Sequence, residues 1–174
     1  AQAGVKYIQV QTNGLDHVEV EKILDAGITL AHCPGDLSSV SLAEGAMMFI
    51  LMLAHGYGFA TDEFFQGKVF SFQGMEVAGR SLGILGFGAS GQQLARRAKV
   101  FGMRVQGIDI REIEKEILRE IGPESMGGPE DLDNMIATCD FISVHLHLNK
   151  DTRHIINSRR IALMKPTAFM INVA

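Results

Sequence analysis

Three glycines and one carboxylate have the residue types and the spacing that phosphate and sugar binding require. Gly86, Gly88 and Gly91 form a GxGxxG pattern, and Asp109 follows about twenty residues later. The first glycine permits a tight turn, the second lets a ligand approach the backbone closely, and the third lets a helix lie against the preceding strand. A helix N-terminus offers unpaired N–H groups to phosphates, and a carboxylate accepts hydrogen bonds from ribose hydroxyls. The spacing therefore predicts a dinucleotide-binding site.

The elements that flank these residues make the prediction more specific than the glycines alone, since glycine occurs 19 times in the chain. Residues 82–85 are an apolar run that predicts a buried strand, and a helical pattern follows the glycines and ends at Gly102. Residues 103–108 predict a second strand, which ends directly before Asp109. A glycine-rich turn in another kind of α/β protein would need this order to arise by chance. The carboxylate favours NAD because it would repel a 2′-phosphate, while Arg111 nearby leaves NADP as an alternative.

Two histidines are the other candidates for chemistry. His145 and His147 alternate at the end of an apolar run at residues 141–146, so both side chains could face the same side of a strand. Such a pair could bind a metal, but no third ligand has suitable spacing, although His154 is near in the sequence. Their position at a strand end favours contacts with a cofactor, and ordinary polar strand ends are the alternative. We predict no metal site.

The order of the predicted elements indicates the fold class. Strands are predicted at residues 7–10, 28–31, 82–85, 103–108, 141–146 and 168–173, and helices at residues 16–27, 41–57, 112–121, 130–139 and 158–164. Asp16 and either Ser38 or Ser39 are expected to cap the first two helices. Residues 59–74 predict an irregular connection, and residues 75–81 a small hairpin. The alternation predicts an α/β fold with a doubly wound parallel sheet, in which ligands bind at the carboxyl ends of the strands.

Composition and charge exclude several classes of function. The chain has 174 residues, of which 47% are apolar and 21% charged, as in an ordinary globular protein. Its net charge of −4, without a basic block, gives no reason to expect nucleic acid or a membrane as a partner. The longest apolar run, residues 46–54, is too short to span a bilayer. Cys33 and Cys139 lie in unrelated segments and suit a reducing compartment, so the cytoplasm is the expected location.

The two ends and one helix carry expectations about the organisation of the chain. An apolar strand is predicted almost at each end, and we expect from this that the chain is a fragment of a longer protein. The helix predicted at residues 41–57 is apolar on most of its faces, which is typical of helices buried between layers, domains or subunits. Its Met and Phe residues are interpreted as core, with a hydrophobic surface for a partner as the alternative. Glu44 on this helix is expected to reach solvent or to brace an interdomain hinge.

Taken together, these segments resemble the D-isomer-specific 2-hydroxyacid dehydrogenases. The resemblance is carried by LGILGFGASGQQLARRAKVFGMRVQGID, ISVHLHLNKDTRHIIN and ALMKPTAFMINVA, and by the earlier TNGLDHVEVEKILDAGITLAHCPG and SLAEGAMMFILMLA. It implies a Rossmann NAD-binding domain at residues 36–174, preceded by a remnant of a flavodoxin-like substrate domain at residues 1–35. It also implies NAD as the cofactor and a homodimer formed through the NAD-binding domain.

The resemblance also implies roles for individual residues. The pyrophosphate would lie on the glycine turn and the start of its helix, at Gly86, Phe87, Gly88, Ala89, Ser90 and Gly91, and the adenosine ribose on Asp109. The adenine and ribose side would be lined by His145, Leu146, His147 and Thr152, and the nicotinamide would reach Val173 and Ala174. Asn13 and Gly14 would offer backbone N–H groups to the carboxylate of the substrate. His32 replaces a usual asparagine, and His147 a frequent proline.

The activity implied is hydride transfer between NAD and a D-2-hydroxyacid or 2-ketoacid. In the family, an arginine that holds the substrate would follow Ala174 directly, and an acid and a general-base histidine would come later. No catalytic residue is therefore assigned within these 174 residues, and we expect the chain to bind the cofactor without turning over substrate. The alternative is a non-catalytic NAD(H)-sensing module of the same family. The sequence does not indicate which hydroxyacid is used.

Overall fold

The structure is a computed structural model that describes residues 4–69 and 74–174. Two parallel sheets are present in this part of the chain. The first is small and pairs β1 (Tyr7–Val10) with β2 (Thr29–His32), with α1 (Val20–Asp25) between them in sequence. The second has five strands in the order β5-β4-β3-β6-β7: β3 (Ser81–Leu85), β4 (Arg104–Ile108), β5 (Ser125–Gly127), β6 (Phe141–Val144) and β7 (Phe169–Asn172).

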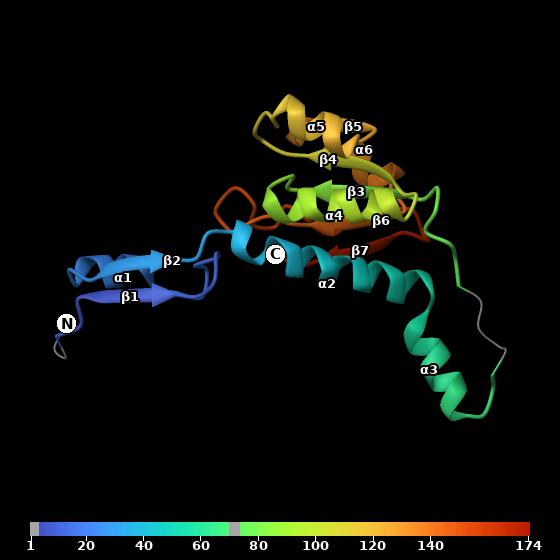
Figure 1. The fold of residues 1–174 in the computed structure, drawn as a ribbon, viewed down its shortest axis with the longest axis horizontal. Helices are drawn as coiled ribbons and strands as arrows, with labels where there is room; N and C mark the ends of the chain where they lie inside the picture. Colours follow the sequence, from blue (N-terminus) through green and yellow to red (C-terminus); the bar gives the residue numbers. More distant parts are fainter. Residues whose placement is uncertain (1–3, 70–73) are drawn as a thin grey trace.

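Helices cover both faces of the five-stranded sheet (Figure 1). On one face α2 (Asp36–Ala54), α4 (Ala89–Val100) and α5 (Lys115–Ile121) share one apolar core with the strands. On the other face α6 (Leu132–Thr138), which follows a short 3-10 turn at Pro129–Asp131, builds a second core with the loop before α7 (Ser158–Ile161). All strand pairs of the sheet are parallel. The prediction of a doubly wound parallel α/β sheet is therefore confirmed.

The central strand β3 is the point at which the chain changes direction across the sheet. From β3 the chain moves outward through β4 to β5, and it then returns to the other side of β3 as β6 and β7. Every residue of β3 is buried, and α4 packs Leu94, Ala95 and Ala98 against the same core with no exposed surface. In sheets of this kind a crevice opens at the carboxyl ends of the two strands where the direction reverses. By this rule the crevice is expected between the ends of β3 and β6.

The N-terminal unit lies to one side of this body, and α3 (Tyr57–Phe65) projects away from the body beyond the end of α2 (Figure 1). α2 runs along the β7 side of the sheet, packed against α4 and β7. By length and composition it is the one helix of the described residues that could cross a membrane, so the expectation that no segment is long enough was wrong. Because Ala43, Ala46 and Ile50 are fully buried, we interpret α2 as a core helix.

Several local predictions were wrong. α1 begins at Val20 with Glu19 as its N-cap, and α2 begins at Asp36, so neither Asp16 nor a serine caps these helices. Residues 57–65 form a helix instead of an irregular connection, because Gly56 adopts a φ of 55° that ends α2 and lets a new helix start. Residues 70–73 of that connection lie outside the described residues. Residues 74–80 contain no strand, and a short edge strand, β5, was missed.

Candidate dinucleotide-binding site

The glycine turn joins β3 to α4 in a backbone path that side chains would block. Gly86 has a φ of 95°, and a Cβ built on it would lie 2.7 Å from the carbonyl oxygen of His145. A Cβ on Gly91 would overlap with the carbonyl oxygen of Gly86. Gly88 differs from both, because the nearest atom to a Cβ built on it would be Nη2 of Arg111, at 3.4 Å. Gly86 and Gly91 are thus required by the fold, whereas Gly88 keeps open space beside the backbone.

The N-terminus of α4 meets this space. Gly88 is the N-cap residue, the first turn carries no acidic residue, and no side chain caps the helix in the described part of the chain. The first α-helical hydrogen bond runs from the Gln92 N–H to the Gly88 carbonyl. The N–H groups of Ala89, Ser90 and Gly91 precede it, and with the positive end of the helix dipole they suit an anionic ligand. The open glycine and the uncapped helix fit the pyrophosphate of a dinucleotide.

Asp109 follows β4 and turns back onto the glycine turn. Its Oδ2 accepts a hydrogen bond of 2.8 Å from the Phe87 N–H, and its Oδ1 accepts one of 2.9 Å from the Arg111 N–H. The Arg111 guanidinium donates to both oxygens, at 3.1 Å each. Burial alone would raise the pKa of Asp109, but these hydrogen bonds outweigh it and hold the pKa below its usual value. The carboxylate is therefore anionic and stands beside the backbone of the predicted pyrophosphate site.

His145 joins the end of β6 to the start of α4. Its Nε2 lies 2.9 Å from the hydroxyl of Ser143, and its Nδ1 lies 3.0 Å from the hydroxyl of Ser90. Burial lowers the pKa of His145 to about 4, so the imidazole is neutral at pH 7, with one nitrogen donating and the other accepting. His145 thereby connects the two sides of the crevice.

The loop after β6 carries the remaining predicted residues on this side. Leu146 packs on the second core and lies close to Gly86. The Thr152 hydroxyl donates to the His147 carbonyl at 2.6 Å and accepts from the Asn149 N–H at 2.8 Å, which fixes the loop. The His147 ring lies 3.1 Å, Nε2 to Nδ2, from the side chain of Asn13. The loop therefore touches both the glycine turn and the N-terminal unit.

The two histidines do not form a pair. The strand ends at Val144, so the alternation of side chains expected for residues 141–146 stops before His145. His145 turns toward Ser90 and His147 toward Asn13. Within the described ranges, no group of three or more His, Cys, Asp or Glu side chains could hold a metal ion.

The last strand and the N-terminal turn carry the remaining predicted site residues. The Val173 N–H donates to the Val144 carbonyl at 3.3 Å, so Val173 lies beside the end of β6. The Ala174 N–H donates to the Asn172 side chain at 3.0 Å, which holds Ala174 at the end of β7. The Gly14 carbonyl accepts from the Thr12 hydroxyl at 2.8 Å. The structure thus brings the glycine turn, Asp109, His145, Leu146 and the end of β7 to one edge of the sheet. It links Asn13 to that edge through His147.

Two participants were missed from the sequence. Ser143 is a fully buried hydroxyl in an otherwise apolar strand, and such a residue signals a polar partner. Arg111 was considered for its charge alone, and its folding back onto Asp109 was not expected. Glu44 pairs with Arg97 of α4 at 3.1 Å and is mostly exposed, so its predicted contact with solvent is confirmed.

Comparisons with known proteins decide the family. Residues 47–174 match the profile of the D-isomer specific 2-hydroxyacid dehydrogenase, NAD binding domain. The chain belongs to this family. It is 38% identical to the D-3-phosphoglycerate dehydrogenase of Methanocaldococcus jannaschii over 92% of the chain and 30% of that protein. NAD is therefore the cofactor of the domain, as predicted.

Solved structures of a dehydrogenase and of a reductase have the same fold. The D-lactate dehydrogenase of Aquifex aeolicus, complexed with NAD and lactic acid, superposes with a TM-score of 0.82 at 29% identity, over 96% of this chain and 49% of that one. An acyclic imino acid reductase in complex with NADPH and D-Arg superposes with a TM-score of 0.80 at 26% identity, over 96% of this chain and 52% of that one. The chain spans about half the length of these proteins, or less.

Proposed function

We propose that this chain is the cofactor-binding part of an oxidoreductase that transfers a hydride between NAD and a D-2-hydroxyacid or 2-ketoacid. The observation that carries the proposal is the edge of the sheet after β3 and β4, where Gly88, the uncapped start of α4 and Asp109 meet. NAD supplies the hydride acceptor or donor when it is bound. The known relatives act on different substrates, so the proposal names the class of substrate and no individual acid.

Each residue of the crevice has a proposed task. The N–H groups of residues 88–91 hold the pyrophosphate, and Asp109 accepts hydrogen bonds from the adenosine ribose. His145, Leu146, His147 and Thr152 line the adenine and ribose side, and Val173 and Ala174 lie on the nicotinamide side. Asn13 and Gly14 offer backbone N–H groups to the substrate carboxylate. The arginine that holds the substrate and the histidine that exchanges the hydroxyl proton are expected outside this chain.

The binding test compares the chain with a variant that fills the space beside the glycine turn. We expect the chain to bind NADH, followed by nucleotide fluorescence, and Gly88→Ala to weaken binding at least tenfold, because the added methyl group occupies the approach of the pyrophosphate. Gly45→Ala adds the same methyl group on α2, where it would meet nothing within 4 Å beyond the adjoining backbone of its own helix, and should leave binding unchanged. Equal NADH affinity in Gly88→Ala would contradict the proposed site.

Activity separates this proposal from its alternative. A protein that contains this chain and reduces 2-ketoacids with NADH supports the dehydrogenase. NADH binding without turnover in a chain extended beyond Ala174 would instead favour an NAD(H)-sensing module.

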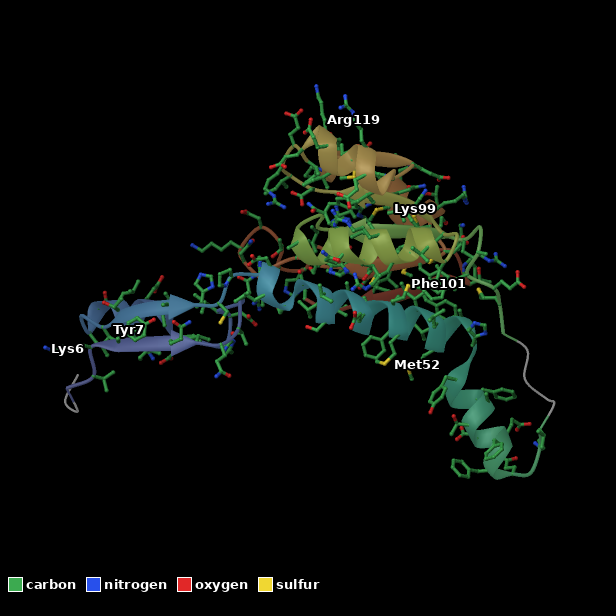
Figure 2. All side chains as sticks on the ribbon, viewed as in Figure 1. Lys6, Tyr7, Met52, Lys99, Phe101 and Arg119 are labelled. Atoms are coloured by element: carbon green, nitrogen blue, oxygen red, sulfur yellow. The ribbon has the colours of Figure 1, made fainter. Side chains whose placement is uncertain are left out.

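We also propose that a second copy of the chain covers the exposed apolar surface of α2 and α3. Phe59, Phe64 and Phe65 of α3 are 57%, 64% and 82% exposed, and contiguous apolar surface of this kind marks interaction sites. A groove of 340 Å³ adjoins them between α2 and the edge strand β7, and Met52 on its wall points to the side of α2 opposite α4 (Figure 2). Light scattering should give a dimer that Phe65→Asp converts to monomer, and a monomeric parent chain would contradict the proposal.

The expected cytoplasmic location and the absence of membrane or nucleic-acid partners stay predictions.

A further inference from the structure

Ser143 carries a buried hydroxyl that has one hydrogen-bond partner. The residue lies in β6 with no exposed surface, between the buried apolar residues Ile142 and Val144. Its oxygen lies 2.9 Å from Nε2 of His145, and no other group in the described part of the chain hydrogen-bonds to this hydroxyl. A buried hydroxyl proton without an acceptor is costly, because the group has given up its hydrogen bonds to water. The Ser143 hydroxyl therefore donates to Nε2 of His145.

This donation determines which nitrogen of His145 carries the proton. The ring is neutral at pH 7, because burial lowers its pKa. In a neutral imidazole one nitrogen donates and the other accepts, and the hydrogen bond at one nitrogen sets the role of the other. Because Nε2 accepts from Ser143, the proton is on Nδ1. Nδ1 lies 3.0 Å from the Ser90 hydroxyl, so it donates to the Ser90 oxygen.

The Ser90 hydroxyl keeps its own proton free for a ligand. Its oxygen accepts from His145, and within residues 4–69 and 74–174 no acceptor takes the Ser90 hydroxyl proton. Ser90 is the second residue of α4 and is partly exposed, so its hydroxyl stands among the free N–H groups of the first turn. With its oxygen held by the ring, the hydroxyl points its proton away from His145. A hydroxyl that donates to a phosphate oxygen forms a charge-assisted hydrogen bond.

We propose that Ser143 and His145 are positioning residues that make the Ser90 hydroxyl a hydrogen-bond donor to the cofactor's pyrophosphate. The direction of donation runs from Ser143 to His145, from His145 to Ser90, and from Ser90 to a phosphate oxygen. The opposite tautomer of His145 would accept the Ser90 proton, and Ser90 would then present lone pairs to an anion. This inference rests on the proposed function, because it requires the pyrophosphate to lie at the start of α4.

The first test reads the tautomer of His145 directly and needs no ligand. Nitrogen-15 NMR of the imidazole at pH 7 identifies the protonated nitrogen, and His145→Asn assigns the signal among the six histidines of the chain. We expect the proton on Nδ1 in the parent chain. In Ser143→Ala a share of it should move to Nε2, because that nitrogen has lost its donor. A parent ring protonated on Nε2 would overturn the inference, whether or not NADH binds.

The second test is a double-mutant cycle on NADH binding. We expect Ser90→Ala to weaken binding about tenfold, because a charge-assisted hydrogen bond is lost. Ser143→Ala should weaken binding about threefold in the parent chain and no further in the Ser90→Ala background, because it acts through Ser90. A merely structural role of Ser143 would weaken binding equally in both backgrounds.

Ser158→Ala is the matched control. Ser158 is an exposed serine in the first turn of α7, so its replacement removes the same hydroxyl from another helix start. It should change the NADH affinity by less than about twofold. Equal effects of Ser143→Ala in both backgrounds, or unchanged affinity in Ser90→Ala, would overturn the inference and leave the proposed function intact. No binding of NADH to the parent chain would overturn both.

Discussion

Two aspartates at opposite edges of the five-stranded sheet are similarly buried and hydrogen-bonded, but their partners differ. Asp109 lies at the carboxyl edge and Asp140 at the amino edge, and their side chains are 7% and 17% exposed. Asp140 accepts hydrogen bonds from the Ser81 N–H, the Ser81 hydroxyl and the Lys165 ammonium, at 2.8 to 2.9 Å. Its partners thus come from distant parts of the chain, whereas the side chain that pairs with Asp109 is two residues away.

The difference lies in the partners. Ser81 is 1% exposed and belongs to the central strand, so Asp140 joins β6 to β3 through a buried N–H and a buried hydroxyl. Arg111 is mostly exposed and can be exchanged for a ligand. The burial of a carboxylate therefore does not distinguish a structural residue from a binding residue. The exposure and the attachment of its partner do.

Replacing Asp140 should have the largest effect on stability. We expect Asp140→Ala to lower the free energy of unfolding by about 3 to 4 kcal/mol, because the Ser81 N–H and the Lys165 ammonium lose their acceptor and the Ser81 hydroxyl loses the shorter of its two hydrogen bonds. Urea unfolding at pH 7 measures this, and the folded variant should bind NADH like the parent. Asp133→Ala is the control, since Asp133 pairs with Arg159 and Arg160 at the surface and should matter clearly less. Equal losses in the two variants would remove the distinction between the sites.

The stability that Asp140 contributes should also depend on pH. Burial by itself would raise the pKa of Asp140, but the hydrogen bonds from Lys165 and Ser81 outweigh it and lower the pKa to about 2. The stabilisation from Asp140 is therefore present above pH 4 and is lost as the pH falls toward 2.

His145 should give the next largest effect, and only in mild acid. Its pKa is about 4 in the folded chain and 6.5 when exposed, so the unfolded chain binds a proton that the folded chain rejects. Stability should be unaffected above pH 6.5 and fall by about 1 kcal/mol at pH 5.5 and about 3 kcal/mol at pH 4. His145→Asn should remove this part of the pH dependence in urea unfolding. A variant whose stability falls as steeply as that of the parent would assign the effect elsewhere.

Asp109 should give the smallest effect on stability and the clearest effect on binding. We expect Asp109→Asn to cost about 1 kcal/mol of folding free energy, because the amide oxygen still accepts from Phe87. NADH binding should weaken about tenfold, because the amide binds the ribose hydroxyls less strongly than a carboxylate does. The ratio of the two effects should be the reverse of that for Asp140→Ala. A large loss of stability without a loss of affinity would make Asp109 a second structural aspartate.

The sequence predicted the strand, glycine turn, helix and strand around Gly86–Gly91 because each residue there satisfies a local rule. Apolar runs, helical spacing and the glycines all favour the same structure. β5 was missed because Ser125–Gly127 is too short and too polar to show a strand pattern, and it forms only because β4 offers an unpaired edge. α3 was missed because its glycines were interpreted as an irregular connection, although Gly56 only separates two helices.

The sequence predicted which residues make up the candidate site better than it predicted the contacts between them. Which residues gather at the carboxyl edge follows from strand order, and His145, Asp109 and the glycines do meet there. Which side chains pair does not follow, because pairing depends on loops whose course local patterns do not determine. The divergence of His145 and His147 and the folding back of Arg111 are both of this kind.

The position of β3 between two halves of the sheet has a consequence for how the molecule assembles. Leu82 pairs with Val105 of the next strand and with Phe141 much later in the chain. Contacts between distant residues require the closure of a long loop, so we expect β3–β4–β5 and β6–β7 to form first and to join last along β3 and β6. The hydrogen bond between Ser81 and Asp140 joins β3 to β6 at their amino ends, and the hydrogen bond between Ser90 and His145 joins α4 to β6 at the carboxyl end. A nucleotide bound at the carboxyl end would stabilise the contact between β3 and β6 that forms last, and it would slow the first step of unfolding.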